Sequence, residues 1–256
     1  MTGKDRNMYA LITGVSSGLG KAMAQYFTER GISVIGVSRS QPEGLPESLH
    51  WIGADITLPA DRERIAERVS AITGGRLDIL INNAGKGIYA TWEEMDENEL
   101  REVFELDFFA PVALTKLLLP QLASAHGSVI NISSAAGRIW VPCMGAYCAA
   151  KAALAMFSNS LRQEIRKHHI HVLDVAPGQV NTGFSSRSCG TRKPPNSPGS
   201  SSHSPRDLAK TVFSAWKRKK QRITYPRSLS FSLFVVRALL PGLYDKINRK
   251  LWGLDN

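Results

Sequence analysis

The sequence predicts one α/β domain built on a doubly wound parallel β-sheet with helices on both faces, followed by a short helical extension at the C-terminus. The length of 256 residues, with 43% hydrophobic residues, suits a single domain of this class. Short apolar runs rich in Val, Ile and Leu alternate with longer amphipathic runs. A glycine-rich turn also joins the first apolar run to the first amphipathic run.

The short apolar runs are the expected strands. They show little alternation, as is typical of strands that are buried on both faces. We expect them at residues 9–13, 33–37, 49–54, 77–81, 128–132, 171–175 and 222–225. The runs between them carry apolar residues at helical spacing and predict helices at residues 20–30, 59–73, 98–124 and 149–168, with one more beginning at Pro205. Strands and helices in alternation predict a parallel sheet with right-handed crossovers.

The composition changes twice toward the C-terminus. Residues 183–205 are rich in Ser and Pro and poor in apolar side chains, which predicts a mobile loop inside the main domain, residues 1–226. Long loops of this kind are usually functional lids or disordered segments. Residues 227–256 mix apolar residues with Lys and Arg, and form the expected C-terminal extension.

The net charge of +10 is concentrated in the last part of the chain. Residues 187–256 hold 15 Lys and Arg residues but only 3 Asp and Glu residues. Such a surplus suggests either nucleic acid or an anionic membrane surface as a partner. No recognition motif accompanies the basic residues, so we expect no nucleic-acid binding.

Several classes of protein do not fit the composition. Three cysteines are too few and too irregularly spaced for a disulfide framework or a structural zinc site, and we expect no metal. The polar N-terminus does not look like a signal peptide. The longest apolar stretch, near residues 229–240, is shorter than the roughly 20 residues that a membrane span needs. We therefore expect a cytoplasmic protein, with membrane contact as an open alternative.

The turn after the first expected strand reads Thr13-Gly-Val-Ser-Ser-Gly-Leu-Gly20. Gly14 permits a tight turn, Gly18 lets the backbone approach a phosphate, and Gly20 allows close packing of helix on strand. A plain glycine-rich turn is the alternative, but the strand before it and the helix after it favour a Rossmann-like dinucleotide site. The candidate cofactor residues here are Gly14, Ser16, Ser17, Gly18, Leu19 and Gly20.

The end of the second expected strand favours NADP(H) over NAD(H). An acidic residue there would bind the 2′-hydroxyl of the ribose, but the chain has Ser38 and Arg39 instead. The guanidinium of Arg39 can pair with a 2′-phosphate, and the Ser38 hydroxyl can add a donor. A solvated surface arginine is the alternative interpretation.

Three residues that suit proton transfer follow later strands. Ser134 comes after the fifth strand, and Tyr147 and Lys151 lie four residues apart, which places them on one face of a helix. A nearby ammonium favours the phenolate, so we expect Lys151 to lower the pKa of Tyr147 toward neutrality. A lone Tyr and Lys pair would be an ordinary helix pair, so the other motifs carry the interpretation.

Together these residues resemble the short-chain dehydrogenase/reductase family over about residues 6–182. The resemblance includes the glycine turn, the sequence NNAG at residues 82–85, Ser134 thirteen residues before Tyr147, and Pro177-Gly-Gln-Val-Asn-Thr182. It implies that Tyr147 is the general acid/base, that Lys151 lowers its pKa and holds the nicotinamide ribose, and that Ser134 binds the substrate oxygen. The residues that it implies along the rest of the cofactor are Asp55, Ile56, Asn83, Ala84, Gly85, Pro177, Gly178, Val180 and Thr182.

The chain departs from the family pattern at Asp107, where the family usually has an asparagine that takes part in a proton relay with the lysine. An ionised aspartate accepts hydrogen bonds but does not donate them, and it would favour the ammonium form of Lys151. Two interpretations follow: a working site with an altered pH profile, or a weakened site in a protein that binds NADP and regulates something else.

The substrate expectation rests on apolar residues near Tyr147. They are Phe184 and the segment that contains Ile139, Trp140, Val141, Cys143 and Met144, and they favour a hydrophobic ketone, aldehyde or alcohol. The extension suits an interfacial helix on an anionic bilayer, a cover over the substrate mouth, or a contact with a second subunit. The leading hypothesis is an NADP(H)-dependent oxidoreductase that forms a homodimer or homotetramer.

Overall fold

The computed structural model describes residues 7–195, 203–226, 235 and 237–254. Its centre is a seven-stranded sheet in the order β3-β2-β1-β4-β5-β6-β7, with every neighbouring pair parallel. The strands are β1 (Met8–Thr13), β2 (Ile32–Ser38), β3 (His50–Gly53), β4 (Ile79–Asn82), β5 (Ser128–Ile132), β6 (His171–Pro177) and β7 (Arg222–Tyr225). The predicted doubly wound α/β fold is confirmed.

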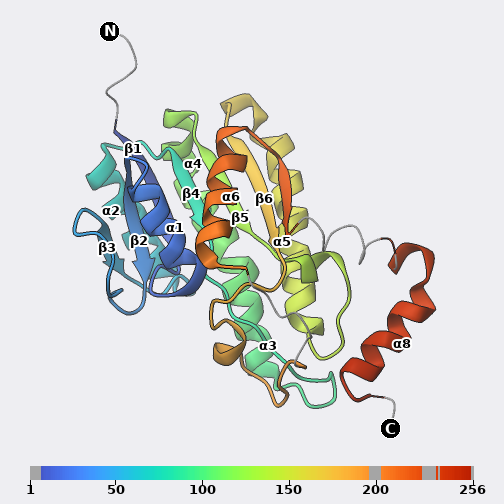
Figure 1. The fold of residues 1–256 in the computed structure, drawn as a ribbon. Coiled ribbons are helices and arrows are strands. Elements are labelled where there is room, and N and C mark those ends of the chain that lie inside the picture. The colour runs from blue at the N-terminus through green and yellow to red at the C-terminus, as the bar shows by residue number, and fades with distance from the viewer. Residues whose placement is uncertain (1–6, 196–202, 227–234, 236, 255–256) are drawn as a thin grey trace.

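Helices cover both faces of the sheet (Figure 1). One face carries α1 (Gly18–Thr28) and α6 (Pro205–Lys217), and the other carries α2 (Pro59–Thr73), α4 (Ala110–Ala125) and α5 (Gly145–Glu164). The helices α3 (Glu97–Phe104) and α8 (Pro241–Leu251) lie outside these two layers. No helix in the described ranges is both long enough and apolar enough to cross a bilayer.

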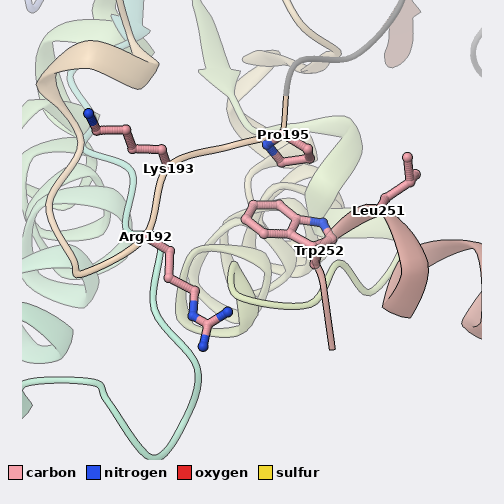
Figure 2. Close-up of a pocket in the computed structure, with 5 residues that line it drawn as sticks. All are labelled: Arg192, Lys193, Pro195, Leu251 and Trp252. Carbon is pink, nitrogen blue, oxygen red and sulfur yellow. The ribbon is translucent and has the colours of Figure 1, made fainter. Parts of the chain in front are cut away.

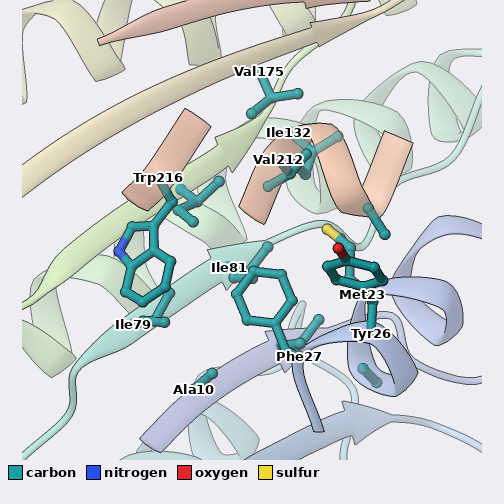
Figure 3. Close-up of a cluster of buried hydrophobic side chains, with 14 of the residues drawn as sticks. Ala10, Met23, Tyr26, Phe27, Ile79, Ile81, Ile132, Val175, Val212 and Trp216 are labelled. Carbon is teal, nitrogen blue, oxygen red and sulfur yellow. The ribbon is translucent and has the colours of Figure 1, made fainter. Parts of the chain in front are cut away.

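Two apolar cores hold the layers together because successive strand residues point to opposite faces. Ala10 of β1 is fully buried against the layer that contains Phe27 and Trp216 (Figure 3). Its neighbour Leu11 is fully buried in the other core, with Leu114 of α4. A sheet that is buried on both faces explains the near-continuous apolar strands of the sequence.

One expected helix is interrupted. The run at residues 98–124 forms α3, then one π-helical turn at Glu105–Phe109, then α4. The backbone stays helical through the π turn, so the three pieces form one continuous helical segment in the chain. Asp107 lies in the middle of this turn, and π turns of this kind are frequent at functional sites.

Part of the expected mobile loop is described, and it is held to the domain. Cys189 pairs with Ile88 in a parallel bridge, and its N–H donates to the carbonyl oxygen of Gly87 at 3.0 Å. Residues 196–202 of that loop, and residues 227–234, 236, 255 and 256 of the extension, lie outside the described residues. The described part of the loop, up to Pro195, is therefore fixed next to the chain segment that follows β4.

The order of the strands places the functional site. The chain moves outward from β1 to β3, then returns to β4 on the other side of β1, so the two crossovers diverge at β1 and β4. Ligands in open parallel sheets bind outside the carboxyl ends of the strands at this divergence. The glycine turn follows β1, and the NNAG segment starts at the end of β4.

Candidate active site

The turn after β1 needs glycine at two positions. Gly14 has a φ of 75°, in the left-handed region that favours glycine. A Cβ atom on Gly20 would lie only 2.1 Å from the carbonyl oxygen of Gly14. The first turn of α1 is therefore packed directly on the end of the strand, as a dinucleotide turn requires.

The N-terminus of α1 is suited to an anion. Ser17 precedes the helix, and its side chain makes no capping hydrogen bond. The first turn, which contains Gly18 and Leu19, holds no acidic residue. Free N–H groups and the helix dipole both favour negative charge at this position. Together with the tight turn, they fit the pyrophosphate of a dinucleotide.

The end of β4 is fastened to the end of β1. The hydroxyl of Thr13 accepts hydrogen bonds from the backbone N–H groups of Asn83 and Ala84, each at 3.0 Å. The side-chain amide of Asn83 donates to the carbonyl oxygen of Thr13 at 2.9 Å. The Asn83 side chain thus braces the glycine turn, while the backbone of residues 83–85 forms an edge of the candidate cofactor site.

The residues that would meet the adenosine end of a dinucleotide lie at the ends of β2 and β3. Arg39 is 83% exposed at its side chain, and its Nη1 lies 4.0 Å from Asp55 Oδ2. The hydroxyl of Ser38 donates to the carbonyl oxygen of Ser40 at 2.8 Å and accepts from the Trp51 ring N–H at 3.1 Å. Ser38 is therefore already engaged, whereas Arg39 is an exposed cation at the end of β2.

The remaining predicted cofactor residues divide between core and loop. Ile56 is buried in the core beside α2. Pro177 ends β6, and the backbone N–H of Gly178 donates to the carbonyl oxygen of Tyr225 at 2.6 Å. Val180 packs on the core beside α1. Thr182 lies against the glycine turn, because a Cβ on Gly18 would come within 3.1 Å of its Cβ.

Ser134, Tyr147 and Lys151 meet outside the carboxyl end of β5. The hydroxyl of Ser134 donates to the carbonyl oxygen of Pro177 at 3.4 Å, and it is near enough to Tyr147 to lower the pKa of that phenol. Lys151 follows one turn later in α5, and its Nζ lies 5.8 Å from the centre of the Tyr147 ring. All three side chains are less than 10% exposed at the residue level. The predicted constellation is therefore assembled, with Tyr147 in the first turn of α5 because the helix starts at Gly145 rather than at residue 149.

Asp107 is a direct partner of Lys151. Its Oδ2 lies 3.4 Å from Lys151 Nζ, which also donates to the carbonyl oxygen of Ile132 at 3.2 Å. The other carboxylate oxygen accepts the backbone N–H of Lys86 at 2.8 Å. The side chain of Asp107 is fully buried, and this burial raises its pKa against the opposing effect of the Lys151 ammonium. A Cβ on Gly85 would lie 3.0 Å from Asp107 Oδ1, so glycine there leaves room for the pair.

The structure does not support the expected direction for the pKa of Tyr147. That pKa is raised, first by burial and second by the negative charge of Asp107, while the Ser134 hydroxyl lowers it. The Lys151 ammonium is paired with the Asp107 carboxylate, so its positive charge does not act on Tyr147 alone. Tyr147 is therefore a phenol at neutral pH, which is the form that donates a proton.

Aromatic side chains surround the open side of Tyr147. The ring of Phe184 lies 5.6 Å from the ring of Tyr147. Tyr89 is buried, its hydroxyl lies 3.1 Å from that of Ser185, and its ring stacks on Trp252 at 6.0 Å. The loop after β6 and the end of the extension thus form a wall beside the catalytic residues.

Trp140 has a different role from the one expected. We expected it to line the substrate site, but it is 46% exposed and its ring N–H donates to Asp245 of α8 at 2.7 Å. Its carbonyl oxygen also accepts the hydroxyl of Tyr244 at 2.8 Å. Trp140 therefore attaches α8 to the domain, whereas Met144 packs with Tyr147 in a small apolar cluster.

Sequence reasoning missed Tyr89 and Trp252. Tyr89 comes four residues after the NNAG segment, and this short distance from a cofactor motif was a usable signal. Trp252 lies in the extension, where the sequence pattern does not indicate which part of the domain it contacts. Only the fold brings the two rings together.

A surface pocket of about 260 Å³ lies next to this wall rather than over Tyr147. Figure 2 shows its lining residues, which come from the loop after β6 and from the end of α8. They are Arg192, Lys193, Pro195, Leu251 and Trp252. The pocket is outside the catalytic constellation, and Trp252 separates it from Tyr89.

Comparisons with known proteins agree with this geometry. The family model described as short chain dehydrogenase matches residues 8–192. The chain is 39% identical over 175 residues to a 3-ketodihydrosphingosine reductase of Bacteroides thetaiotaomicron, covering 68% of the chain and just 64% of that reductase. It is 33% identical to an uncharacterized oxidoreductase of Escherichia coli, with 96% of each chain covered. The crystal structure of a short-chain dehydrogenase from Streptomyces avermitilis is 32% identical, with a TM-score of 0.79 over 96% of this chain and 99% of that one.

Proposed function

The chain belongs to the short-chain dehydrogenase family, and from that premise we propose that it transfers hydride between NADP(H) and a hydrophobic ketone, aldehyde or secondary alcohol. The observation that carries the proposal is the meeting of Ser134, Tyr147 and Lys151 beside the glycine turn. The name of the Bacteroides relative, a reductase of a keto compound, supports carbonyl chemistry. The aromatic wall around Tyr147 supports an apolar substrate.

The residues present fit a dinucleotide. The pyrophosphate would lie at the N-terminus of α1, whose first turn is held against the end of β1 by the close approach of Gly20 to the Gly14 carbonyl oxygen. Lys151 would hold the nicotinamide ribose, and Arg39 the 2′-phosphate. When bound, NADP(H) supplies or accepts the hydride.

Tyr147 controls the proton that accompanies the hydride. In reduction the substrate carbon gains a hydride, its carbonyl π bond breaks, and the oxygen takes the phenolic proton of Tyr147 to give an alcohol. Oxidation reverses both transfers, with Tyr147 as the base. The hydroxyl of Ser134, which lies beside Tyr147, holds the substrate oxygen in position for this transfer.

Replacing Arg39 with alanine tests the choice of cofactor. We expect the affinity for NADPH to fall about tenfold to hundredfold, because a charge-assisted hydrogen bond to the 2′-phosphate is lost, while the affinity for NADH stays the same. Fluorescence titration with both nucleotides measures this. Arg68→Ala, at an exposed arginine of α2, is the matched control. An unchanged NADPH affinity in Arg39→Ala would contradict the assignment.

The second candidate function is a regulatory protein that binds NADP without turnover. The observation in its favour is the buried Asp107 carboxylate, which forms an ion pair with Lys151 and whose negative charge raises the pKa of Tyr147. The oxidation of NADPH, followed at 340 nm with a broad panel of ketones and aldehydes, separates the two functions. Turnover supports the enzyme, and NADPH binding without turnover across the panel supports the regulator.

A contact of α8 with an anionic bilayer is also part of the proposal. Leu243, Ile247 and Leu251 form an exposed apolar stripe along this helix, and Lys246 and Lys250 flank it. Apolar side chains bordered by lysines suit an interfacial helix. Tyr244 borders this stripe and attaches α8 to Trp140, and Leu251 also lines the pocket beside Pro195. Leu243 and Ile247 are 48% and 46% exposed, so they are the side chains that remain available for a bilayer.

Vesicle binding tests this contact. We expect the full chain to sediment with vesicles containing anionic lipid, less so at high salt, and not with neutral vesicles. Combining Leu243→Ser with Ile247→Ser should weaken the binding at least about tenfold, because two apolar side chains that would enter the bilayer are lost. Met156→Ser, at an exposed methionine of α5, is the control. If the unaltered chain does not bind anionic vesicles, the proposed contact of α8 with a bilayer is wrong.

A further inference from the structure

Arg187 lies against the glycine turn although it comes from the loop after β6. It ends a short 3-10 helix at Ser185–Arg187. Its Nη2 is 3.5 Å from where a Cβ on Gly18 would stand, and Gly18 is the first residue of α1. The same nitrogen donates to the carbonyl oxygen of Thr182 at 3.1 Å, which holds the guanidinium in this position. Two segments far apart in the sequence therefore meet at the helix N-terminus.

The guanidinium of Arg187 has N–H groups available for a further ligand. Within the described ranges it donates to the Thr182 carbonyl oxygen and has no carboxylate partner. Arg192 in the same loop differs, because it makes two hydrogen bonds to the carboxylate of Glu94. A guanidinium has five N–H groups in a planar fork, so most of those of Arg187 remain for an anion. The side chain is also exposed, which keeps it accessible.

We propose that Arg187 binds the pyrophosphate of the dinucleotide from the side opposite the N-terminus of α1. The inference rests on the proposed NADP(H) function, and it adds a ligand that the glycine turn alone does not supply. A planar guanidinium forms paired hydrogen bonds with phosphate oxygens, and the first turn of α1 supplies N–H groups from the other side. The phosphates are then enclosed between the helix and the loop.

This contact links cofactor binding to the substrate side of the site. Arg187 follows Phe184, whose ring lies 5.6 Å from that of Tyr147, and Ser185, whose hydroxyl contacts Tyr89. A pyrophosphate held by Arg187 therefore fixes the segment that packs beside the catalytic tyrosine. The cofactor should bind first and prepare the wall against which the apolar substrate lies.

The test compares Arg187→Gln with Arg166→Gln. Arg166 is also exposed, but it lies in the turn before β6, at the opposite edge of the sheet. We expect Arg187→Gln to weaken NADPH and NADH binding by the same factor, about tenfold to hundredfold, because both carry the pyrophosphate. This equal loss distinguishes it from Arg39→Ala. We also expect a higher KM for the carbonyl substrate at saturating NADPH, with a smaller change in kcat.

Hydrogen exchange supplies a second readout. NADPH should slow amide exchange in residues 184–192 of the unaltered chain and of Arg166→Gln, but much less in Arg187→Gln at saturating NADPH. Unchanged nucleotide affinity together with unchanged protection in Arg187→Gln would overturn the role of Arg187 and leave the proposed function intact. Failure of the unaltered chain to bind any nicotinamide dinucleotide would contradict the proposed function, and this inference with it.

Discussion

Phenylalanine in place of Tyr147 should leave NADPH binding intact and slow carbonyl reduction about a hundredfold to ten-thousandfold. The hydroxyl is the group that transfers the proton, and general acid catalysis of this kind contributes about that range. The ring itself would stay packed against Phe184 in the apolar cluster next to α5, so the fold and the cofactor site should be preserved. NADPH oxidation with the best substrate of the panel measures the rate, and fluorescence titration measures the binding.

The matched control is Tyr26→Phe. Tyr26 is also a buried tyrosine, but it lies in α1 and packs on Phe213 in the core. The activity of Tyr26→Phe therefore measures the general effect of removing a hydroxyl from a buried tyrosine ring. Equal activity in Tyr147→Phe and Tyr26→Phe would exclude Tyr147 as the general acid.

The sequence was sufficient to predict the layers of the fold and most of the catalytic residues. Both follow from local patterns: a strand buried on two faces is apolar throughout, and Tyr147 and Lys151 share a helix face wherever that helix lies. The position of Ser134 beside them follows from the parallel sheet, because β5 and α5 adjoin at the carboxyl edge. Such features depend on spacing along the chain, which a sequence displays directly.

The features that could not be predicted depend on contacts between distant segments. The reversal of the Tyr147 pKa shift requires knowing that Asp107, forty residues earlier, is fully buried within 3.4 Å of Lys151. The π turn that carries Asp107 lies inside one continuous helical run, and its residue types do not mark it as different from an α-helix. Arg187 likewise looked like one more basic residue of a charged tail, and only its position over Gly18 gives it a separate meaning.

Asparagine in place of Asp107 should move the pH profile of the enzyme toward lower pH by about one to two units. The negative charge of Asp107 is the second cause of the raised Tyr147 pKa, so removing it lowers that pKa. Oxidation needs the phenolate, and its activity should therefore begin to rise at a lower pH. Reduction needs the phenol, and its activity should begin to fall at a lower pH. At a fixed pH on either limb the change is about tenfold to hundredfold.

The pKa of Asp107 itself determines the pH below which the unaltered chain and Asp107→Asn should have the same activity. Burial raises that pKa, so the folded protein takes up the proton more readily than the unfolded chain does. The stability gained from this protonation is present in acid and is lost as the pH rises through the raised pKa. The melting temperature of the unaltered chain should therefore fall relative to that of Asp107→Asn as the pH rises through that range.

In acid, where Asp107 is neutral, the two proteins should have the same Tyr147 protonation and similar rates. Coincident profiles at every pH would show that Asp107 does not act on Tyr147. A profile shifted toward higher pH would contradict the direction of the charge effect.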